Sequence, residues 1–234
     1  MTCLETAVAP VPGEGVSPAL DRGEAGSGIA REYERRKGNR EARVRKAHPR
    51  VGGLLLALRE PPQHETAFHR GALGEKAVAE SLERRTADSP AILLHSRRMP
   101  GGRGDIDHVA VTPTGVYVVD AKDLRGKVRI ARALFGAEKL FVAGRNRTKL
   151  IDGLDRQVAV VEAVLNANGH PDVPVRGVLC FTKADLPLLG TLKMRGHLLL
   201  YRKALAKRLN ADGPLGAAAI DGLARTIAEA LPSG

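Results

Sequence analysis

Tryptophan is absent from this sequence, and its 234 residues include only four phenylalanines and three tyrosines. Proteins that bind single-stranded nucleic acid by stacking bases on aromatic rings are therefore disfavoured. Cysteine is equally scarce, since Cys3 and Cys180 are the only two, and no CxxC or HxxxH spacing occurs. The sequence thus excludes a zinc module and offers no disulfide framework.

Long apolar runs are also missing. The longest apolar stretch covers residues 51–58, far fewer than the ~20 residues that a membrane-spanning helix needs. Residues 1–28 lack the basic segment followed by an apolar run that is typical of a signal peptide. We therefore expect a soluble protein of the cytoplasm with no transmembrane segment.

Positive charge is what the chain has in excess. Its 37 Lys and Arg residues outnumber 26 Asp and Glu residues, for a formal net charge of +11. This balance favours an anionic partner, of which nucleic acid is the commonest and a membrane surface the second. A solvated basic surface that only aids solubility is the alternative.

The composition divides the chain into three parts. Residues 1–28 are rich in Ala, Pro, Gly and Glu without apolar periodicity, which predicts a disordered tail. Residues 29–66 form a basic extension, expected to be helical, in which residues 31–50 hold nine basic side chains and three glutamates. This extension could lie on nucleic acid, on anionic lipid as a membrane anchor, or on the body of the protein. A compact domain is expected over residues 67–234.

The periodicity of the domain predicts an α/β fold with a mixed central sheet flanked by helices. Helical patterns occur at 74–85, 154–166 and 216–231. Strand patterns occur at 91–95, 107–112, 116–122, 127–130, 140–143, 175–182 and 198–201.

The two strands on either side of Pro113-Thr114-Gly115 form a predicted hairpin, because Pro and Gly occupy positions that a tight turn favours. With Pro113 and Thr114 as a two-residue turn, the pairing places Asp107 opposite Asp120. A bulge at Gly115 would make them diagonal neighbours, still roughly 5–8 Å apart. Side chains alternate along a strand, so Lys122 shares the face of Asp120.

Two adjacent carboxylates repel each other, which makes this arrangement costly unless it serves a function. A divalent cation removes the conflict, and Mg²⁺ is typically bound by one or two carboxylates together with water and substrate phosphate. Lys122 would then orient or activate the attacking water and offset charge in the transition state. The structural alternative is a buried ion pair between Lys122 and an aspartate, with Asp107 capping the turn region.

Four glycine-rich and acidic segments together resemble the NERD (nuclease-related) domain, a branch of the PD-(D/E)XK nuclease superfamily. The resemblance covers roughly residues 70–185, and the whole chain is similar to actinobacterial-type members. The segments are Gly71-x-x-Gly74-Glu75, Gly104-Asp105-Ile106-Asp107-His108-Val109, Gly115-Val116-Tyr117-Val118-Val119-Asp120-Ala121-Lys122 and Gly126.

The resemblance implies a restriction-endonuclease-like core and a phosphodiesterase site. Asp107 corresponds to the first strand acid of the family, and Asp120 and Lys122 to its (D/E)-x-K motif, with Asp in place of the commoner Glu. Glu75 matches the acid on the leading helix and would complete a metal shell with Asp107 and Asp120. Gln157 matches a polar position on the helix that follows the core sheet. The implied cofactor is Mg²⁺, with Mn²⁺ as the alternative ion.

Two basic clusters are candidate phosphate contacts, although Arg-rich surface loops are an equally good interpretation. They consist of Arg97, Arg98 and Arg103, and of Arg145, Arg147 and Lys149. The sequence thus predicts a Mg²⁺-dependent nuclease that acts on DNA in repair, processing or defence. A catalytically weak or inactive nucleic-acid-binding module of the same fold is the alternative. The sequence leaves open whether the chain forms a homo-oligomer.

Overall fold

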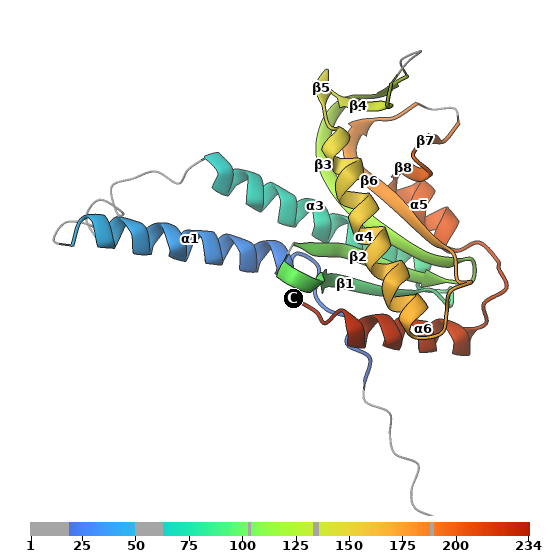
Figure 1. Cartoon of the computed structure of the whole chain (residues 1–234). Helices are drawn as coiled ribbons and strands as arrows, with labels where there is room; N and C mark the ends of the chain where they lie inside the picture. Colours follow the sequence, from blue (N-terminus) through green and yellow to red (C-terminus); the bar gives the residue numbers. More distant parts are fainter. Residues whose placement is uncertain (1–18, 50–62, 103, 133–135, 188–189) are drawn as a thin grey trace, which may run out of the picture.

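The computed structural model describes residues 19–49, 63–102, 104–132, 136–187 and 190–234. Its central feature is a mixed sheet with helices on both faces (Figure 1), as the sequence predicts. The strands are β1 (Ile92–Arg98), β2 (Asp105–Thr112), β3 (Gly115–Ala131), β4 (Lys139–Val142), β5 (Arg145–Asn146), β6 (Val175–Asp185), β7 (Leu192–Met194) and β8 (His197–Tyr201). The helices are α1 (Ser27–Ala47), α3 (Gln63–Thr86), α4 (Thr148–Ala167), α5 (Arg202–Leu209) and α6 (Ala217–Ala230), with a 3-10 turn at Pro100–Gly102.

The strand order is β1-β2-β3-β6-β8-β7, and the sheet contains both strand directions. β1, β2 and β3 pair antiparallel as a meander, while β6 pairs parallel with β3 on one side and with β8 on the other. β4 and β5 branch from the far end of β3. The sheet is therefore antiparallel at its β1 and β7 edges and parallel at its centre.

The predicted hairpin is present with the predicted register. Thr112 pairs with Gly115 and His108 with Val119, so Pro113 and Thr114 form a two-residue turn without a bulge. Gly115 has a φ of 120°, and a β-carbon there would lie 2.5 Å from the carbonyl oxygen of Pro174. A glycine is required by both the backbone conformation and the available space.

The core consists of two layers, one on each face of the sheet. α4 and α6 cover one face, where Val116 and Val118 of β3 are buried. α3 and α5 cover the other, where Tyr117 and Val119 of β3 are buried. Because both faces are covered, the middle of β3 is apolar without alternation.

The last part of the expected disordered tail is ordered in the structure: residues 21–24 lie along β1, and α1 begins at Ser27. The Arg22 carbonyl oxygen accepts a 2.7 Å hydrogen bond from the His95 N–H. The Asp21 carboxylate pairs with Arg97, whose side chain is 0% exposed. A buried guanidinium needs an anionic partner, and this segment supplies it.

The elements differ from the prediction in several places, and the short strands β5 and β7 were not predicted. α3 runs from Gln63 to Thr86, through the expected boundary between extension and domain at residue 67. β3 continues to Ala131 past an irregularity between Lys122 and Arg125, so the expected strand at 127–130 is its second half. α5 was not predicted, because basic residues interrupt its apolar pattern. Of the helices in the described residues, none has the length and apolar character to cross a membrane.

Candidate active site

The hairpin brings Asp107, Asp120 and Lys122 together. Asp120 Oδ2 lies 2.7 Å from Lys122 Nζ, and the side chains are 10% and 23% exposed. Asp107 Oδ2 accepts a 2.8 Å hydrogen bond from the Ala121 N–H. The sequence analysis gave a buried ion pair between Lys122 and an aspartate as the alternative to a catalytic role. This ion pair is present, between Lys122 and Asp120, and both of its members are predicted catalytic residues.

The electrostatics of this group reflect its enclosure. Enclosure by protein raises the pKa of Asp107 well above its usual range, and the carboxylates of Asp120 and Glu75 add to the rise. Burial disfavours the Lys122 ammonium, but the charges of Asp120 and Asp107 outweigh it and raise the pKa of Lys122. The carboxylates of Asp107 and Asp120 thus repel each other as expected, and the positive charge of Lys122 offsets part of this repulsion.

Glu75 lies on α3, close to Asp107 and Lys122. The glycine that precedes it allows α3 to pack close to the sheet. A β-carbon at Gly74 would lie 2.9 Å from the β-carbon of Asp123 on β3, so glycine allows α3 to approach the sheet closely. Glu75 is 3% exposed, and its Oε1 accepts hydrogen bonds from the Gly26 N–H (2.8 Å) and the Ser96 hydroxyl (3.0 Å). Burial raises the pKa of Glu75.

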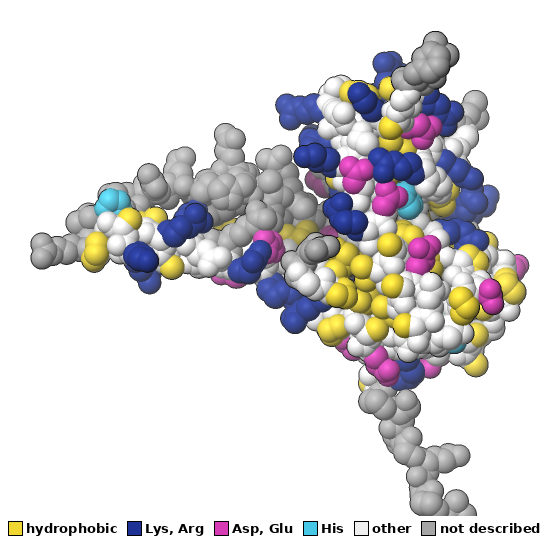
Figure 2. Space-filling view, viewed as in Figure 1, with side chains coloured by type: hydrophobic (Ala, Val, Ile, Leu, Met, Phe, Trp, Pro, Cys, Tyr) yellow, Lys and Arg dark blue, Asp and Glu magenta, His cyan; other side chains and the backbone are white. Residues whose placement is uncertain are grey.

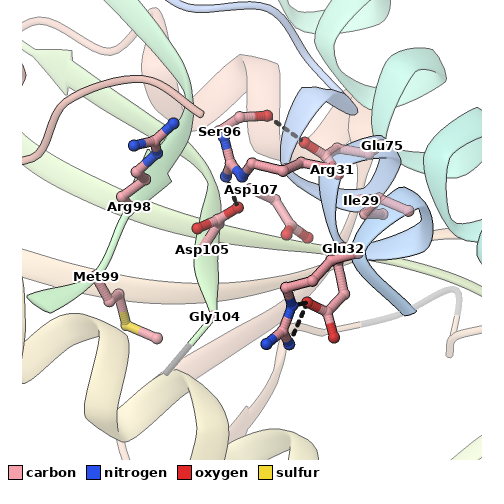
Figure 3. Close-up of a pocket in the computed structure, with 12 residues that line it drawn as sticks. Ile29, Arg31, Glu32, Glu75, Ser96, Arg98, Met99, Gly104, Asp105 and Asp107 are labelled. Carbon is pink, nitrogen blue, oxygen red and sulfur yellow. Dashed lines mark hydrogen bonds and ion pairs between the residues drawn. The ribbon is translucent and has the colours of Figure 1, made fainter. Parts of the chain in front are cut away.

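A cavity of about 570 Å³ opens beside these acids, and Glu75, Asp105 and Asp107 are among the residues that line it. This volume is in the usual range for small-molecule sites. Its lining comes from α1, α3, β1, β2 and the connection between β1 and β2: Gly28, Ile29, Arg31, Glu32, Arg35, Glu75, Ser96, Arg98, Met99, Gly104, Asp105 and Asp107. Figure 3 shows Glu75 directed toward Ser96 and Asp105 directed toward Arg31.

A cation fits this site only in part. Among the described residues, no three His, Cys, Asp or Glu side chains lie close enough together to hold a metal ion. The structure therefore does not gather Asp107, Asp120 and Glu75 into one shell, since Glu75 Oε1 is engaged by Gly26 and Ser96. Asp107 and Asp120 remain a fitting pair, because Mg²⁺ commonly uses one or two carboxylates and Asp107 is an enclosed acid beside another acid.

Comparison with known families identifies this part of the chain. Residues 70–182 match the family model described as the nuclease-related domain, NERD. This segment is a NERD domain. It contains Glu75, Asp107, Asp120, Lys122 and Gln157, whereas α1, α5 and α6 lie outside the match. No match was found among curated proteins or among solved structures.

Gln157 lies on α4 of the NERD domain, against the start of β2. Its Nε2 donates a 3.4 Å hydrogen bond to the Asp105 carbonyl oxygen, and its buried Oε1 has no hydrogen-bond partner among the described residues. Gln157 thus contacts the backbone beside the acids rather than the acids themselves.

The first basic cluster is divided by the structure. Arg98 lines the cavity. Arg97 does not: it is fully buried, and it donates to Asp21 and to the His95 and Leu231 carbonyl oxygens. Its prediction as a nucleic-acid contact is corrected, because no face of its guanidinium is left for a phosphate. Arg103 lies outside the described residues.

The second basic cluster lies at the other end of the NERD domain, where β5 meets α4. Arg145 and Lys149 are exposed there, and Arg147 is half-buried. None of the three lines the cavity. Figure 2 shows further Lys and Arg side chains over the upper part of the molecule and along α1; on β3 and β4 the exposed ones are Arg125, Lys127, Arg129 and Lys139.

The sequence interpretation missed the contribution of residues near the start of α1. Arg31 Nη2 lies 2.6 Å from Asp105 Oδ2, and Arg31 and Arg35 both line the cavity. A signal existed in the spacing of Gly28, Arg31 and Arg35, which is that of one helix face. The signal was hidden because residues 31–50 are basic on every side.

Proposed function

We propose that the protein is a metal-dependent nuclease whose NERD domain hydrolyses phosphodiester bonds, with DNA as the substrate. The family match supports a nuclease-related function and interaction with nucleic acid. The single observation that carries the enzymatic proposal is the juxtaposition of Asp107, Asp120 and Lys122 on one hairpin. Of these three, Asp107 lines the cavity.

In this proposal Asp107 and Asp120 would hold Mg²⁺ or Mn²⁺. When bound, such an ion polarises the phosphate and lowers the pKa of a coordinated water. Lys122 would place its ammonium where negative charge develops on the phosphate oxygens, and such electrostatic stabilisation is usually the largest single term in catalysis. Glu75 would orient the segment around Ser96 and Gly26, and Arg98 would contact the phosphate from β1.

The test is incubation of the purified protein with labelled single- and double-stranded DNA and RNA, each with Mg²⁺, Mn²⁺ or EDTA. We expect cleavage of DNA with either metal and none in EDTA. An Asp107→Asn preparation serves as the control for contaminating nucleases and should be inactive. Asp185→Asn, which removes an exposed aspartate of β6, should retain activity. Cleavage that persists in the Asp107→Asn preparation would contradict the proposal.

A nucleic-acid-binding module without turnover is the second candidate. The observation in its favour is that Lys122 already neutralises Asp120, while the described residues form no three-ligand metal cluster. This candidate predicts tight binding to DNA in the presence of Mg²⁺ or Mn²⁺ without cleavage of any of the four substrates.

A further inference from the structure

α1 begins at the cavity. Two glycines, Gly26 and Gly28, allow the start of this helix to pack closely against Glu75 and Asp105. Gly26, with a φ of 86°, donates its N–H to Glu75 Oε1. A β-carbon at Gly28 would overlap the carboxylate of Asp105. On α3, a β-carbon at Gly71 would lie 3.3 Å from Ile29 Cδ1. The start of α1 is therefore closely packed on both α3 and β2.

One face of α1 forms a wall of the cavity. Gly28, Arg31, Glu32 and Arg35 recur at the spacing of a single helix face, and all four line the cavity. Figure 3 shows Arg31 directed toward Asp105. Arg35 Nε donates a 2.8 Å hydrogen bond to Glu32 Oε2. This wall supplies two guanidinium groups opposite the carboxylates of the NERD domain.

The guanidinium groups retain capacity to bind an anion. The structure records one polar partner for Arg31 within the part of the chain that it describes, the 2.6 Å contact of Nη2 with Asp105 Oδ2. An arginine has five donor hydrogens in a fixed fork. Gly234 packs beside Nη1 and Nη2 of Arg31, so Nε is the donor left for a second oxyanion. The Arg35 side chain is 66% exposed and its partner Glu32 is a neighbour on the same helix, a pairing that is weak in water.

We propose that Arg31 and Arg35 hold a phosphate of the nucleic acid beside Asp107, so that the substrate pocket is built jointly by the NERD domain and the preceding helix. The inference rests on the proposed function and names residues outside the family match. Arginine suits the task because its fork binds phosphate with two parallel hydrogen bonds. The ion pair with Asp105 fixes the position of Arg31 before substrate arrives.

The first experiment measures binding without cleavage. Fluorescence anisotropy of a labelled 20-nucleotide duplex and its single strand, in EDTA, compares two double variants of the full chain. Arg31→Ala with Arg35→Ala should weaken binding at least about tenfold, the scale of losing charge-assisted hydrogen bonds. Arg43→Ala with Arg45→Ala removes the same charge from exposed positions of the same helix and should weaken it by no more than about threefold. Equal losses in the two variants would overturn the proposal.

The second experiment changes the docking of α1 without changing its charge. Gly28→Leu forces the start of α1 away from Asp105, whereas Gly38→Leu adds the same side chain on the same helix where no atom lies within 4 Å. Gly28→Leu should weaken binding about tenfold and Gly38→Leu should leave it unchanged, with both variants folded by circular dichroism. Unchanged binding in Gly28→Leu would overturn the proposal. Tighter binding or faster cleavage would do so too, because α1 would then be a cover over the site.

The two proposals fail in different ways. If the wild type cleaves no substrate but Arg31→Ala with Arg35→Ala loses binding, the nuclease proposal fails and the phosphate pocket stands. If the wild type cleaves DNA and this double variant binds and cleaves normally, the nuclease proposal stands and the contribution of α1 is refuted.

Discussion

Replacement of Lys122 distinguishes a catalytic role of this side chain from a purely structural one. Its ammonium should stabilise the transition state, so Lys122→Ala should bind DNA within a few-fold of wild type and cleave it at least ~100-fold more slowly. Lys122→Arg should not restore the rate, since a guanidinium fork has a different reach. Cleavage and binding assays measure both quantities.

Lys183 is a matched control for Lys122, because it lies on the neighbouring strand and pairs with Asp123 at 3.0 Å. Lys183→Ala should leave the cleavage rate near that of wild type. If Lys122→Ala unfolds while its folded fraction cleaves normally, the ion pair with Asp120 is structural and the active site lies elsewhere.

Replacement of Asp107 tests for metal binding by melting temperature, without a measurement of cleavage. In EDTA, Asp107→Asn should melt at or above the wild-type temperature, because the substitution removes one of two repelling carboxylates. Its amide oxygen can still accept the Ala121 N–H. Added Mn²⁺ should raise the melting temperature of wild type and of Asp185→Asn, but not of Asp107→Asn, because only a native-state site is stabilised by ligand. Equal shifts in all three proteins would exclude a site at Asp107.

The His95–His108 pair should make the fold sensitive to mild acid. Burial lowers the pKa of His95 and places that of His108 well below its usual value, and their Nδ1 atoms lie 2.9 Å apart. Both pKa values are depressed in the folded state, so the unfolded chain takes up protons first. Stability is therefore complete above pH ~6.5 and falls as the pH drops below it.

Urea unfolding at pH 7.5 and pH 5.0 measures this dependence. His108→Leu should lose less stability between these pH values than wild type does. His48→Leu, which replaces an exposed histidine at the end of α1, should behave as wild type. An identical loss in His108→Leu would assign the acid sensitivity to other groups.

At the scale of elements, the close approach of α3 to β3 depends on Gly74. Gly74→Ala should destabilise the protein, since overpacking typically costs ~1–3 kcal/mol and the gain in helix propensity is only about 1 kcal/mol. Gly222→Ala in α6 adds the same methyl group where no atom lies within 4 Å, and it should stabilise by up to ~1 kcal/mol. The midpoints of urea unfolding show whether each variant is more or less stable than wild type. A stabilised Gly74→Ala would show that α3 and β3 move apart at little cost in free energy.

At the scale of the whole molecule, the net charge of +11 predicts that DNA binding weakens steeply with salt. If the cluster at the β5–α4 corner contacts phosphates, Arg145→Ala with Lys149→Ala should reduce the slope of log K against log salt by about 1.8 on duplex DNA, at ~0.9 per lost contact. Arg84→Ala with Lys207→Ala removes equal charge from exposed positions of α3 and α5 and should leave the slope unchanged. Equal slopes in the two variants would mean that the corner does not contact DNA.

Local pattern was sufficient for the fold class, the hairpin and its register. The turn at Pro113-Thr114 connects adjacent strands, so the alternation of side chains fixes which residues oppose each other within about fifteen positions. That places Asp107 near Asp120 and Lys122 on the same face as Asp120. The glycine and acid motifs in the same region were enough to indicate the NERD family.

Tertiary structure alone decided what surrounds those residues. Arg97 and Arg98 are adjacent in a basic loop by sequence, yet one is buried against Asp21 and the other lines the cavity. Arg31 contacts Asp105 across 74 positions, and Glu75 meets Gly26 across 49. Such contacts depend on the packing of α1 and α3 on the sheet rather than on any local periodicity. The pairing of Asp107 and Asp120 is therefore encoded locally in the hairpin, whereas Glu75 and the arginines that face these acids are positioned only by the packing of distant elements.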